Sequence, residues 1–281
     1  MDKVNEKTSF YKKVMAATVN ASLYYPNPDG TNVKYDSVQG TRPIKTTITN
    51  ARINHPPCIL HHGFELFNIN DLELNFDAIN LSDFAEKVSS YLMRITNKDR
   101  CLVLGCVQRN TNASKQLKDF SDTRPPVFVP HTDWTAKRIE NLFNKADANM
   151  CTRPTLTEDE LFHFLKNNPN FELYNLWFPL NLVLSYPLAL CSIESVSVEN
   201  IRNMIFDNGI DKEVLYSLKQ SDEYRWYYYP LMQKGEVLIF KQWDNTIKNY
   251  MPVFHTAFEL PGIDPKSLYP RRNIEYRILV A

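Results

Sequence analysis

Residues 237–258, VLIFKQWDNTIKNYMPVFHTAF, decide the fold class of this 281-residue chain. Two apolar runs, Val237–Lys241 and Met251–Phe258, lie on either side of a polar segment, and each has a length typical of a β-strand. Similar runs recur in the second half of the chain, separated by turns rich in proline and aspartate, at Tyr174–Phe178, Leu188–Ile193, Arg225–Tyr229 and Asn273–Val280. The second half is therefore predicted to be mostly β-sheet.

The first half of the chain adds shorter elements. Lys45–Ile53 and Glu65–Ile69 are predicted strands, and the continuous apolar run Cys101–Val107 fits a buried strand. Leu81–Thr96 is the clearest helix, because Ser82 can cap it and its apolar side chains fall on one helical face.

A second helix is predicted to begin after Thr157, which can form a capping box with Glu160. Many strands with two helices predict a closed or sandwiched β core with helical support, and a jelly roll is the architecture that we expect. We expect a single domain over residues 1–281. Its parts are an N-terminal arm with helical support, a jelly-roll core and a helical insertion within that core, at about residues 1–100, 101–281 and 136–170 respectively.

The composition excludes several classes of function. Thirty-two basic and thirty-two acidic residues cancel, and the pI is near 7.0, so no long-range field attracts the chain to nucleic acid or to an anionic membrane. No stretch approaches the ~20 apolar residues of a membrane helix, and the N-terminus lacks the apolar segment of a secretory signal. Five cysteines without a CxxC pair are typical of reduced thiols. We therefore expect a cytoplasmic protein that binds neither nucleic acid nor a membrane.

His131 and Asp133 form the chain's one His-x-Asp pair. Residues two apart on a strand point to the same side, and non-heme iron sites use two imidazoles and one carboxylate on one face of the metal. Six histidines and thirty-two acidic residues are enough for one such pair to arise by chance. A surface turn after Pro130 is therefore an equal alternative at this point.

A third metal ligand must come from a distant strand, and His255 is the candidate. It lies within the apolar run Val253–Phe258, where a histidine held in the core by a hydrogen bond is the ordinary alternative. A rival metal set comprises His61, His62 and Glu65, with possible support from His55. Gly63 and the strand-like residues around it disfavour the helix that this set needs.

One face of the last predicted strand carries charge. Arg271, Asn273, Glu275 and Arg277 are spaced two residues apart and so share that face. An arginine with a polar neighbour two residues on can bind a terminal carboxylate through a two-pronged contact and one further hydrogen bond. The distal carboxylate of 2-oxoglutarate needs such a site, although a solvent-facing edge strand would show the same pattern.

An ordered set of short motifs extends from about Ala21 to the C-terminus. It comprises Asn27–Gly30, Gly63–Leu66, the His-x-Asp-x-Thr block that ends at Thr135, Asn175–Trp177, Pro187–Cys191, Arg225–Tyr228, Phe240–Asp244, His255–Phe258 and Arg271–Arg277. In this set the chain resembles the hydroxylase/desaturase family of non-heme Fe(II)- and 2-oxoglutarate-dependent oxygenases, which includes a fungal gibberellin desaturase and a component of the bacterial cephamycin methoxylation system.

The resemblance implies a double-stranded β-helix core with His131, Asp133 and His255 on Fe(II). It places Arg271 and Asn273 at the Arg-x-Ser positions that bind 2-oxoglutarate in related enzymes, with Arg277 further along the same face. We predict that Arg271 rather than Arg277 binds this cosubstrate.

Three positions depart from the family pattern. Asn273 replaces a serine, and an amide can supply the same hydrogen bond. Phe178 replaces an arginine and Ser192 replaces an aspartate, and these two changes alter the polarity expected of the pocket.

The expected function is oxidation of a small molecule with Fe(II), 2-oxoglutarate and O2, by hydroxylation, desaturation or ring closure. Candidate substrate residues are Trp177, Arg225, Tyr228 and Lys241, and the two basic ones favour a carboxylate-bearing specialised metabolite, terpenoid or amino-acid-derived. Two alternatives remain: an iron oxidase or cyclase that takes all its electrons from the substrate, and a non-catalytic β-sandwich binding protein.

Overall fold

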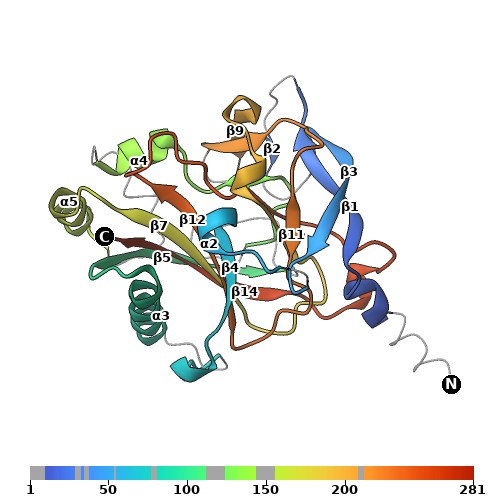
Figure 1. The fold of residues 1–281 in the computed structure, drawn as a ribbon, viewed down its shortest axis with the longest axis horizontal. Coiled ribbons are helices and arrows are strands. Elements are labelled where there is room, and N and C mark those ends of the chain that lie inside the picture. The colour runs from blue at the N-terminus through green and yellow to red at the C-terminus, as the bar shows by residue number, and fades with distance from the viewer. Residues whose placement is uncertain are drawn as a thin grey trace.

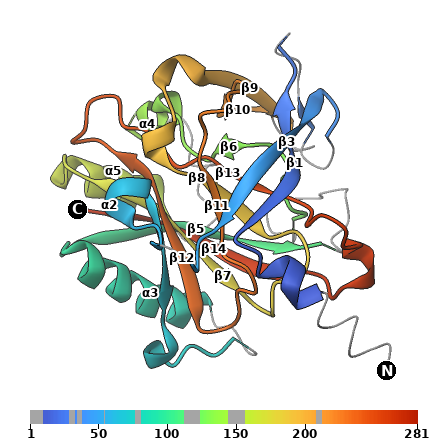
Figure 2. The same ribbon diagram turned by 45° about the vertical axis from the view of Figure 1, so that its right-hand side comes forward.

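The computed structural model describes residues 10–28, 33–34, 38–53, 55–76, 81–111, 124–143, 156–207 and 212–281. These residues form a nine-stranded and a five-stranded β-sheet (Figures 1 and 2). Apolar side chains of the two sheets meet in one buried cluster, with Leu190 from the larger sheet and Trp177, Leu238 and Phe240 from the smaller. The prediction of a mostly β fold is confirmed.

The nine-stranded sheet brings two distant histidines together. Its strands lie in the order β1 (Thr18–Pro26), β3 (Thr41–Asn50), β11 (Trp226–Tyr228), β8 (Leu188–Cys191), β13 (His255–Ala257), β6 (His131–Thr132), β10 (Lys212–Leu218), β9 (Ile201–Asp207) and β2 (Val33–Lys34). Neighbouring strands are antiparallel except at β3–β11 and β9–β2. Because β13 pairs with β6, His255 lies directly opposite His131.

The five-stranded sheet is antiparallel throughout. Its strands lie in the order β4 (Phe64–Asn68), β12 (Glu236–Asp244), β7 (Glu172–Pro179), β14 (Arg272–Val280) and β5 (Cys101–Asn110). Successive side chains on a strand point to opposite faces. Trp177 and Phe240 therefore face the other sheet, while Tyr174 and Ile239 face outward into a separate cluster.

Helix α3 (Leu81–Thr96) covers the outer face of the five-stranded sheet (Figures 1 and 2). The ring of Phe84 stacks on Tyr276 at 5.5 Å between centroids and lies edge-on to Phe178 at 5.0 Å. The outer face of this sheet is consequently buried and apolar. The predicted cap is wrong, because Ser82 lies inside the helix.

Shorter helices among the described residues include α2 (Ile59–His62), α4 (Ala136–Phe143) and α5 (Glu158–Asn167). The predicted capping box of α5 is confirmed: the Glu160 N–H donates to the Thr157 hydroxyl at 3.2 Å, and the Thr157 N–H donates to the Glu160 carboxylate at 2.8 Å. Single 3-10 turns occur at Asn70–Leu72, Ile193–Ser195, Val198–Asn200 and Pro265–Ser267. No helix among the described residues is long and apolar enough to cross a membrane.

Several predicted boundaries differ from the structure. The strand predicted at Met251–Phe258 is only His255–Ala257, and Pro252 has no N–H to give to a ladder. The strand predicted at Lys45–Ile53 is Thr41–Asn50, and Ile193 begins a 3-10 turn instead of ending β8. Strands β1, β2, β6, β9 and β10 are absent from the sequence prediction.

Candidate active site

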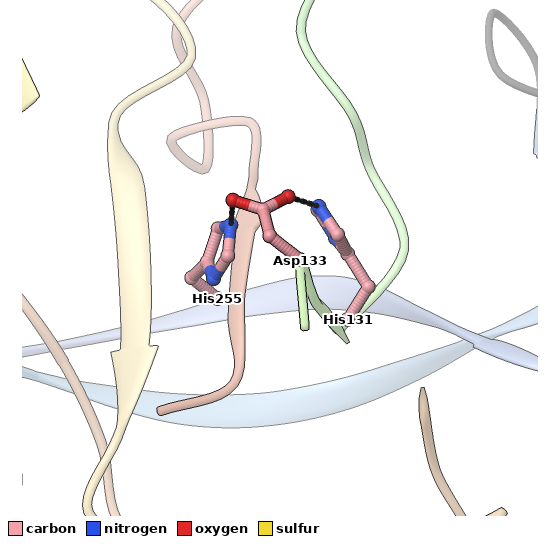
Figure 3. A group of neighbouring side chains, drawn as sticks. All are labelled: His131, Asp133 and His255. Atoms are coloured by element: carbon pink, nitrogen blue, oxygen red, sulfur yellow. Dashed lines mark ion pairs between the residues drawn. The ribbon is translucent and has the colours of Figure 1, made fainter. Parts of the chain in front are cut away.

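Three predicted ligands converge between the sheets. His131 lies on β6, Asp133 follows that strand, and His255 lies on β13. Their side chains point toward one another (Figure 3), and their ligand atoms all lie within 4.8 Å of one another. Nε2 of His131 is 3.8 Å from one carboxylate oxygen of Asp133, and Nε2 of His255 is 4.0 Å from the other. The three residues are only 3–5% exposed, and they are the one group with metal-ligand geometry in the described part of the chain.

Hydrogen bonds fix which nitrogen each histidine presents. Nδ1 of His131 is 2.7 Å from the Val129 carbonyl oxygen, and Nδ1 of His255 is 3.4 Å from that of Val253. A carbonyl can only accept, so each Nδ1 carries the proton and each Nε2 offers a lone pair. Burial lowers the pKa of His131, and burial together with the neighbouring His131 lowers that of His255 to about 3. Both rings are therefore neutral, as metal ligation requires.

Four side chains hold Asp133 in place. The Asn175 amide donates to carboxylate Oδ2 at 2.5 Å, and Nη2 of Arg277 lies 3.1 Å from Oδ1. The Asp133 N–H donates to Gln242 at 3.0 Å, and Arg138 donates to the Asp133 carbonyl at 2.7 Å. Burial opposes ionisation of Asp133, but the neighbouring basic groups, of which the Arg277 guanidinium contributes most, together outweigh burial and hold the pKa of Asp133 well below its ordinary value. Asp133 is thus an oriented anion between two neutral imidazoles.

A narrow cavity leads to the two histidines. Its walls are Val127, Trp177, Leu188 and Ala257 on the apolar side, and Arg109, Arg271 and Glu275 beside His131 and His255 on the polar side. Its free space is about 10 Å³, close to the room that one water molecule needs. A larger molecule therefore enters only if lining side chains turn aside.

The polar face of β14, together with Arg271 immediately before the strand, borders this cavity. Arg271 is 1% exposed, lies 5.7 Å from the Trp177 ring centroid, and donates to the Tyr186 carbonyl. Asn273 is completely buried, and neither polar atom of its amide has a hydrogen-bond partner among the described residues. Burial, and then the charge of Asp133, raise the pKa of Glu275 to about 7.

A family profile described as an oxidoreductase/YMDC permease-like domain matches residues 9–281. The chain belongs to this family.

Relatives of this oxidoreductase-family chain have informative names. The Fe(II)/2-oxoglutarate-dependent dioxygenase NvfI of Aspergillus novofumigatus is 24% identical over 278 residues, 94% of this chain and 92% of the relative. The alpha-ketoglutarate-dependent dioxygenase TstK of Talaromyces stipitatus is 22% identical over 92% of this chain and 94% of the relative. The hydroxylase/desaturase EfuI of Hormonema carpetanum is 29% identical over 56% of this chain and 52% of the relative. The predicted resemblance is confirmed.

A solved structure supports the same conclusion about the fold. The iron and alpha-ketoglutarate-dependent endoperoxidase NvfI superposes with a TM-score of 0.67 and 20% identity, over 94% of this chain and 98% of that chain. At this identity the likeness is one of fold. The jelly roll predicted for this member of the oxidoreductase family is confirmed.

The structure separates the predicted substrate residues. Trp177 lines the cavity. Tyr228 faces away from it, in another apolar cluster, and its hydroxyl donates to the Val14 carbonyl at 2.8 Å. Lys241 faces outward on β12 and pairs with Glu172 and Asp244, each at 2.9 Å.

Arg225 and the rival histidines lie at the surface. The Arg225 side chain is 50% exposed and pairs with Glu194 at 2.9 Å, and Glu194 also lies 3.4 Å from His61. The His62 ring packs against Tyr227, and Glu65 accepts from the Ile59 N–H at 3.3 Å. His61, His62 and Glu65 therefore have separate partners and do not share one centre.

Sequence reasoning missed four polar side chains around the centre: Arg109, Asn175, Gln242 and Glu275. Asn175 and Gln242 fall within motifs that carried the family resemblance, and Glu275 shares the face of Arg271. Those placements were the available signals, because no spacing rule predicts which buried amide will contact a metal-binding carboxylate.

Proposed function

We propose that this chain is an Fe(II)- and 2-oxoglutarate-dependent dioxygenase that oxidises a small organic molecule. The observation that carries the proposal is the buried cluster of His131, Asp133 and His255, which shares a cavity with Arg271. Iron bound there, together with 2-oxoglutarate and O2, supplies an oxidant able to remove hydrogen from an unactivated carbon.

The donor set fits a divalent iron ion. Two neutral imidazoles and one carboxylate are the ligands of this class of iron site and leave further coordination positions open. The Asn175 amide orients the Asp133 carboxylate, and the Arg277 guanidinium keeps that carboxylate ionised in the metal-free protein, although it also competes with a metal ion for the carboxylate charge. The protein therefore holds its ligands in the required protonation states before the metal arrives, which reduces the cost of binding.

The polar face of β14 fits 2-oxoglutarate. Arg271 offers a buried guanidinium whose planar fork matches a carboxylate. Asn273, two residues along, has an amide with unused donor capacity among the described residues. Arg277 is engaged with Asp133 at 3.1 Å, which favours Arg271 as the residue that binds the distal carboxylate.

The substrate is a small carboxylate-bearing metabolite. Val127, Trp177, Leu188 and Ala257 supply an apolar wall for a carbon skeleton. Arg225 and Lys241 are directed elsewhere, so Arg109 is the cavity cation that we assign to the substrate carboxylate. Similar proteins are named a hydroxylase/desaturase and an endoperoxidase, and hydroxylation, desaturation and ring closure all begin with hydrogen removal at a positioned carbon.

We further propose that the chain acts in the cytoplasm on a free small molecule rather than on nucleic acid or a membrane. The net charge of zero supports this partner class. Cys58, Cys101, Cys106 and Cys191 are free thiols, as in a reducing compartment; Cys151 lies outside the described residues.

The test is an anaerobic titration of metal-free protein with Fe(II), with and without 2-oxoglutarate, followed by visible charge-transfer absorbance. We expect a band that needs both components, and its loss in His255→Ala but not in His163→Ala, a change at an exposed histidine of α5. Iron binding that is indifferent to 2-oxoglutarate would favour the cosubstrate-independent oxidase. Absence of iron binding would favour a binding protein.

Substrate class is tested by succinate release across small acids, their methyl esters and peptides. Acids should be turned over faster than their esters, and Arg109→Met should remove that preference. Equal turnover of acids and esters by the unmodified protein would refute the carboxylate assignment, and turnover of peptides alone would refute the metabolite assignment.

A further inference from the structure

Glu275 is a buried carboxyl group beside the candidate iron centre for which the proposed chemistry has no use. It is 3% exposed and lines the same cavity as His131 and His255. It lies on β14 directly opposite Trp177 of β7. An ionised Glu275 would place a second buried negative charge beside Asp133. Burying this charge costs stability unless a positive or hydrogen-bonding group compensates it.

Two donors connect Glu275 to Asp133. The Asn175 amide nitrogen lies 3.2 Å from Glu275 Oε1 and 2.5 Å from Asp133 Oδ2. The Arg277 guanidinium lies 3.6 Å from Glu275 Oε1 through Nε, and 3.1 Å from Asp133 Oδ1 through Nη2. Asn175 and Arg277 are themselves directly opposite each other on β7 and β14. The Asn175 amide is therefore hydrogen-bonded to both Asp133 and Glu275, and the Arg277 guanidinium is ion-paired with both.

Arg277 and a bound metal ion would both interact with the Asp133 carboxylate, and so they compete for its negative charge. A guanidinium held against Asp133 withdraws negative charge that a divalent cation would otherwise meet. A second carboxylate against the same guanidinium offsets part of its positive charge and so weakens the ion pair between Arg277 and Asp133. The competition between cation and metal therefore depends on whether Glu275 carries its charge.

We propose that Glu275 is a positioning residue that acts on Asp133 through Arg277 and so sets the affinity of the centre for its divalent metal. The inference rests on the proposed function, in which His131, Asp133 and His255 bind the metal. Glu275→Gln keeps the shape of the side chain and one acceptor for Asn175 but removes the charge. This variant should therefore weaken metal binding although none of the three ligand residues is substituted.

The test uses Co(II) as the probe, added to metal-free protein at pH 8 and followed by its visible d–d absorbance. Loss of a partner in the outer shell of a metal site changes affinity by about 10–100-fold, so Glu275→Gln should raise the Co(II) dissociation constant by at least about ten-fold. Its d–d spectrum should also change, because Asp133 is reoriented, and Glu275→Asp, which restores the charge, should recover most of the affinity.

The matched control is Glu172→Gln. Glu172 is a partly buried carboxylate on β7, paired with Lys241 at 2.9 Å and Lys98 at 3.4 Å on the outward side of the sheet. Its neutralisation should leave the Co(II) affinity and spectrum unchanged. An equal loss of affinity in this control would reduce the Glu275 effect to general loosening of the sheet, and would overturn the proposal.

Arg277→Met separates action through Arg277 from a direct field effect. With the competing guanidinium removed, this variant should bind Co(II) at least as tightly as the unmodified protein, and adding Glu275→Gln to it should change the affinity by less than about three-fold. The proposal would be overturned if Arg277→Met alone bound Co(II) ten-fold more weakly, or if Glu275→Gln reduced the Co(II) affinity as much in the Arg277→Met background as in the unmodified protein. The Arg277→Met measurement tests the proposal even if Glu275→Gln does not fold. Failure of the unmodified protein to bind Co(II) would instead overturn the metal site itself.

Discussion

Replacement of Arg271 by methionine is expected to abolish 2-oxoglutarate binding while leaving the metal site intact. Methionine has a similar length and no charge, so it can keep the packing against Trp177, whose ring centroid lies 5.7 Å from the guanidinium carbon. Arg271 is not a member of the cluster of His131, Asp133 and His255 that would hold the metal. The change therefore removes the proposed anion receptor alone.

The magnitude follows from the contacts that are lost. A two-pronged arginine–carboxylate contact consists of two charge-assisted hydrogen bonds, each contributing about 1.5–3 kcal/mol. Together they amount to roughly 3–6 kcal/mol, which is about 10²–10⁴ in the dissociation constant of 2-oxoglutarate. Arg271 also donates to the Tyr186 carbonyl, and leaving that acceptor unsatisfied should cost about 1–3 kcal/mol of folding stability.

The assay has two separate readouts. Anaerobic Fe(II)-protein is titrated with 2-oxoglutarate to obtain its dissociation constant from the charge-transfer band, and metal-free protein is titrated with Co(II) to obtain metal affinity. Arg271→Lys keeps the positive charge but not the two-pronged guanidinium, so its 2-oxoglutarate dissociation constant should lie between those of the unmodified protein and Arg271→Met. The reasoning is refuted if Arg271→Met raises the 2-oxoglutarate constant less than about three-fold, or if Arg277→Met raises it more.

Three further outcomes are expected. Metal-free protein should lose stability on acidification. Burial lowers the pKa of His131 and His255, so below about pH 6.5 these rings take up protons in the unfolded chain but not in the folded one, and each ring removes ~1.4 kcal/mol of stability per pH unit. Burial raises the pKa of Glu275 to about 7, so between that pH and its unfolded pKa near 4.5 this carboxyl group adds stability on acidification and offsets the loss from about one ring. Urea unfolding at pH 7 and 5.5 should show the loss, and a more stable protein at 5.5 would contradict it. Phe84→Ala should cost about 3–5 kcal/mol of unfolding free energy, because its buried ring packs against three other rings, and the Co(II) affinity should not change; a cost below 1 kcal/mol would be inconsistent with that packing. Asn273→Leu should stabilise metal-free protein by about 1–3 kcal/mol, because both polar atoms of this buried amide have no hydrogen-bond partner in the described chain, and should weaken 2-oxoglutarate binding; a destabilised variant with normal binding would contradict both statements.

The sequence predicted the parts of the site that depend on local spacing. His131 and Asp133 are two positions apart, and a two-residue period places both on one side of the chain. Local spacing could not place His255 near these two residues, because its position opposite His131 is set by the pairing of β13 with β6. No local pattern encodes a pairing between strands so distant in sequence, and the candidate came from an isolated histidine in an apolar run.

Strand parity explains why Lys241 was proposed as a pocket residue. On β12, Val237 and Ile239 face outward beneath α3 while Leu238 and Phe240 face inward, and both sets are buried and apolar. An alternating pattern tells inside from outside only when one face is polar. Lys241 follows the outward set.

The missed strand β1 shows the opposite case. Its burial alternates along most of its length, with Val19, Ala21, Leu23 and Tyr25 buried. This period-two pattern is visible in the sequence and is typical of a strand with one buried face. Strand β6 offered no such signal, because two residues are too few to carry a period.

The inward face of β14 runs against the rule by which the rest of the chain folds. Its outward residues Ile274, Tyr276 and Ile278 pack in the apolar cluster beneath α3, while Asn273, Glu275 and Arg277 face the centre. Buried polar groups cost stability unless they are paired, and charged ones cost more, so an apolar inward face would have given a more stable sheet. Glu275 and Arg277 are paired within the protein, but Asn273 has no hydrogen-bond partner among the described residues. A strand that keeps such a group in its core is less stable than it could be, and conflicts of this kind concentrate where binding requires them. Strand β14 is therefore a place where the chain is less stable than an apolar strand would be, and we propose that the cosubstrate approaches the metal from this polar face.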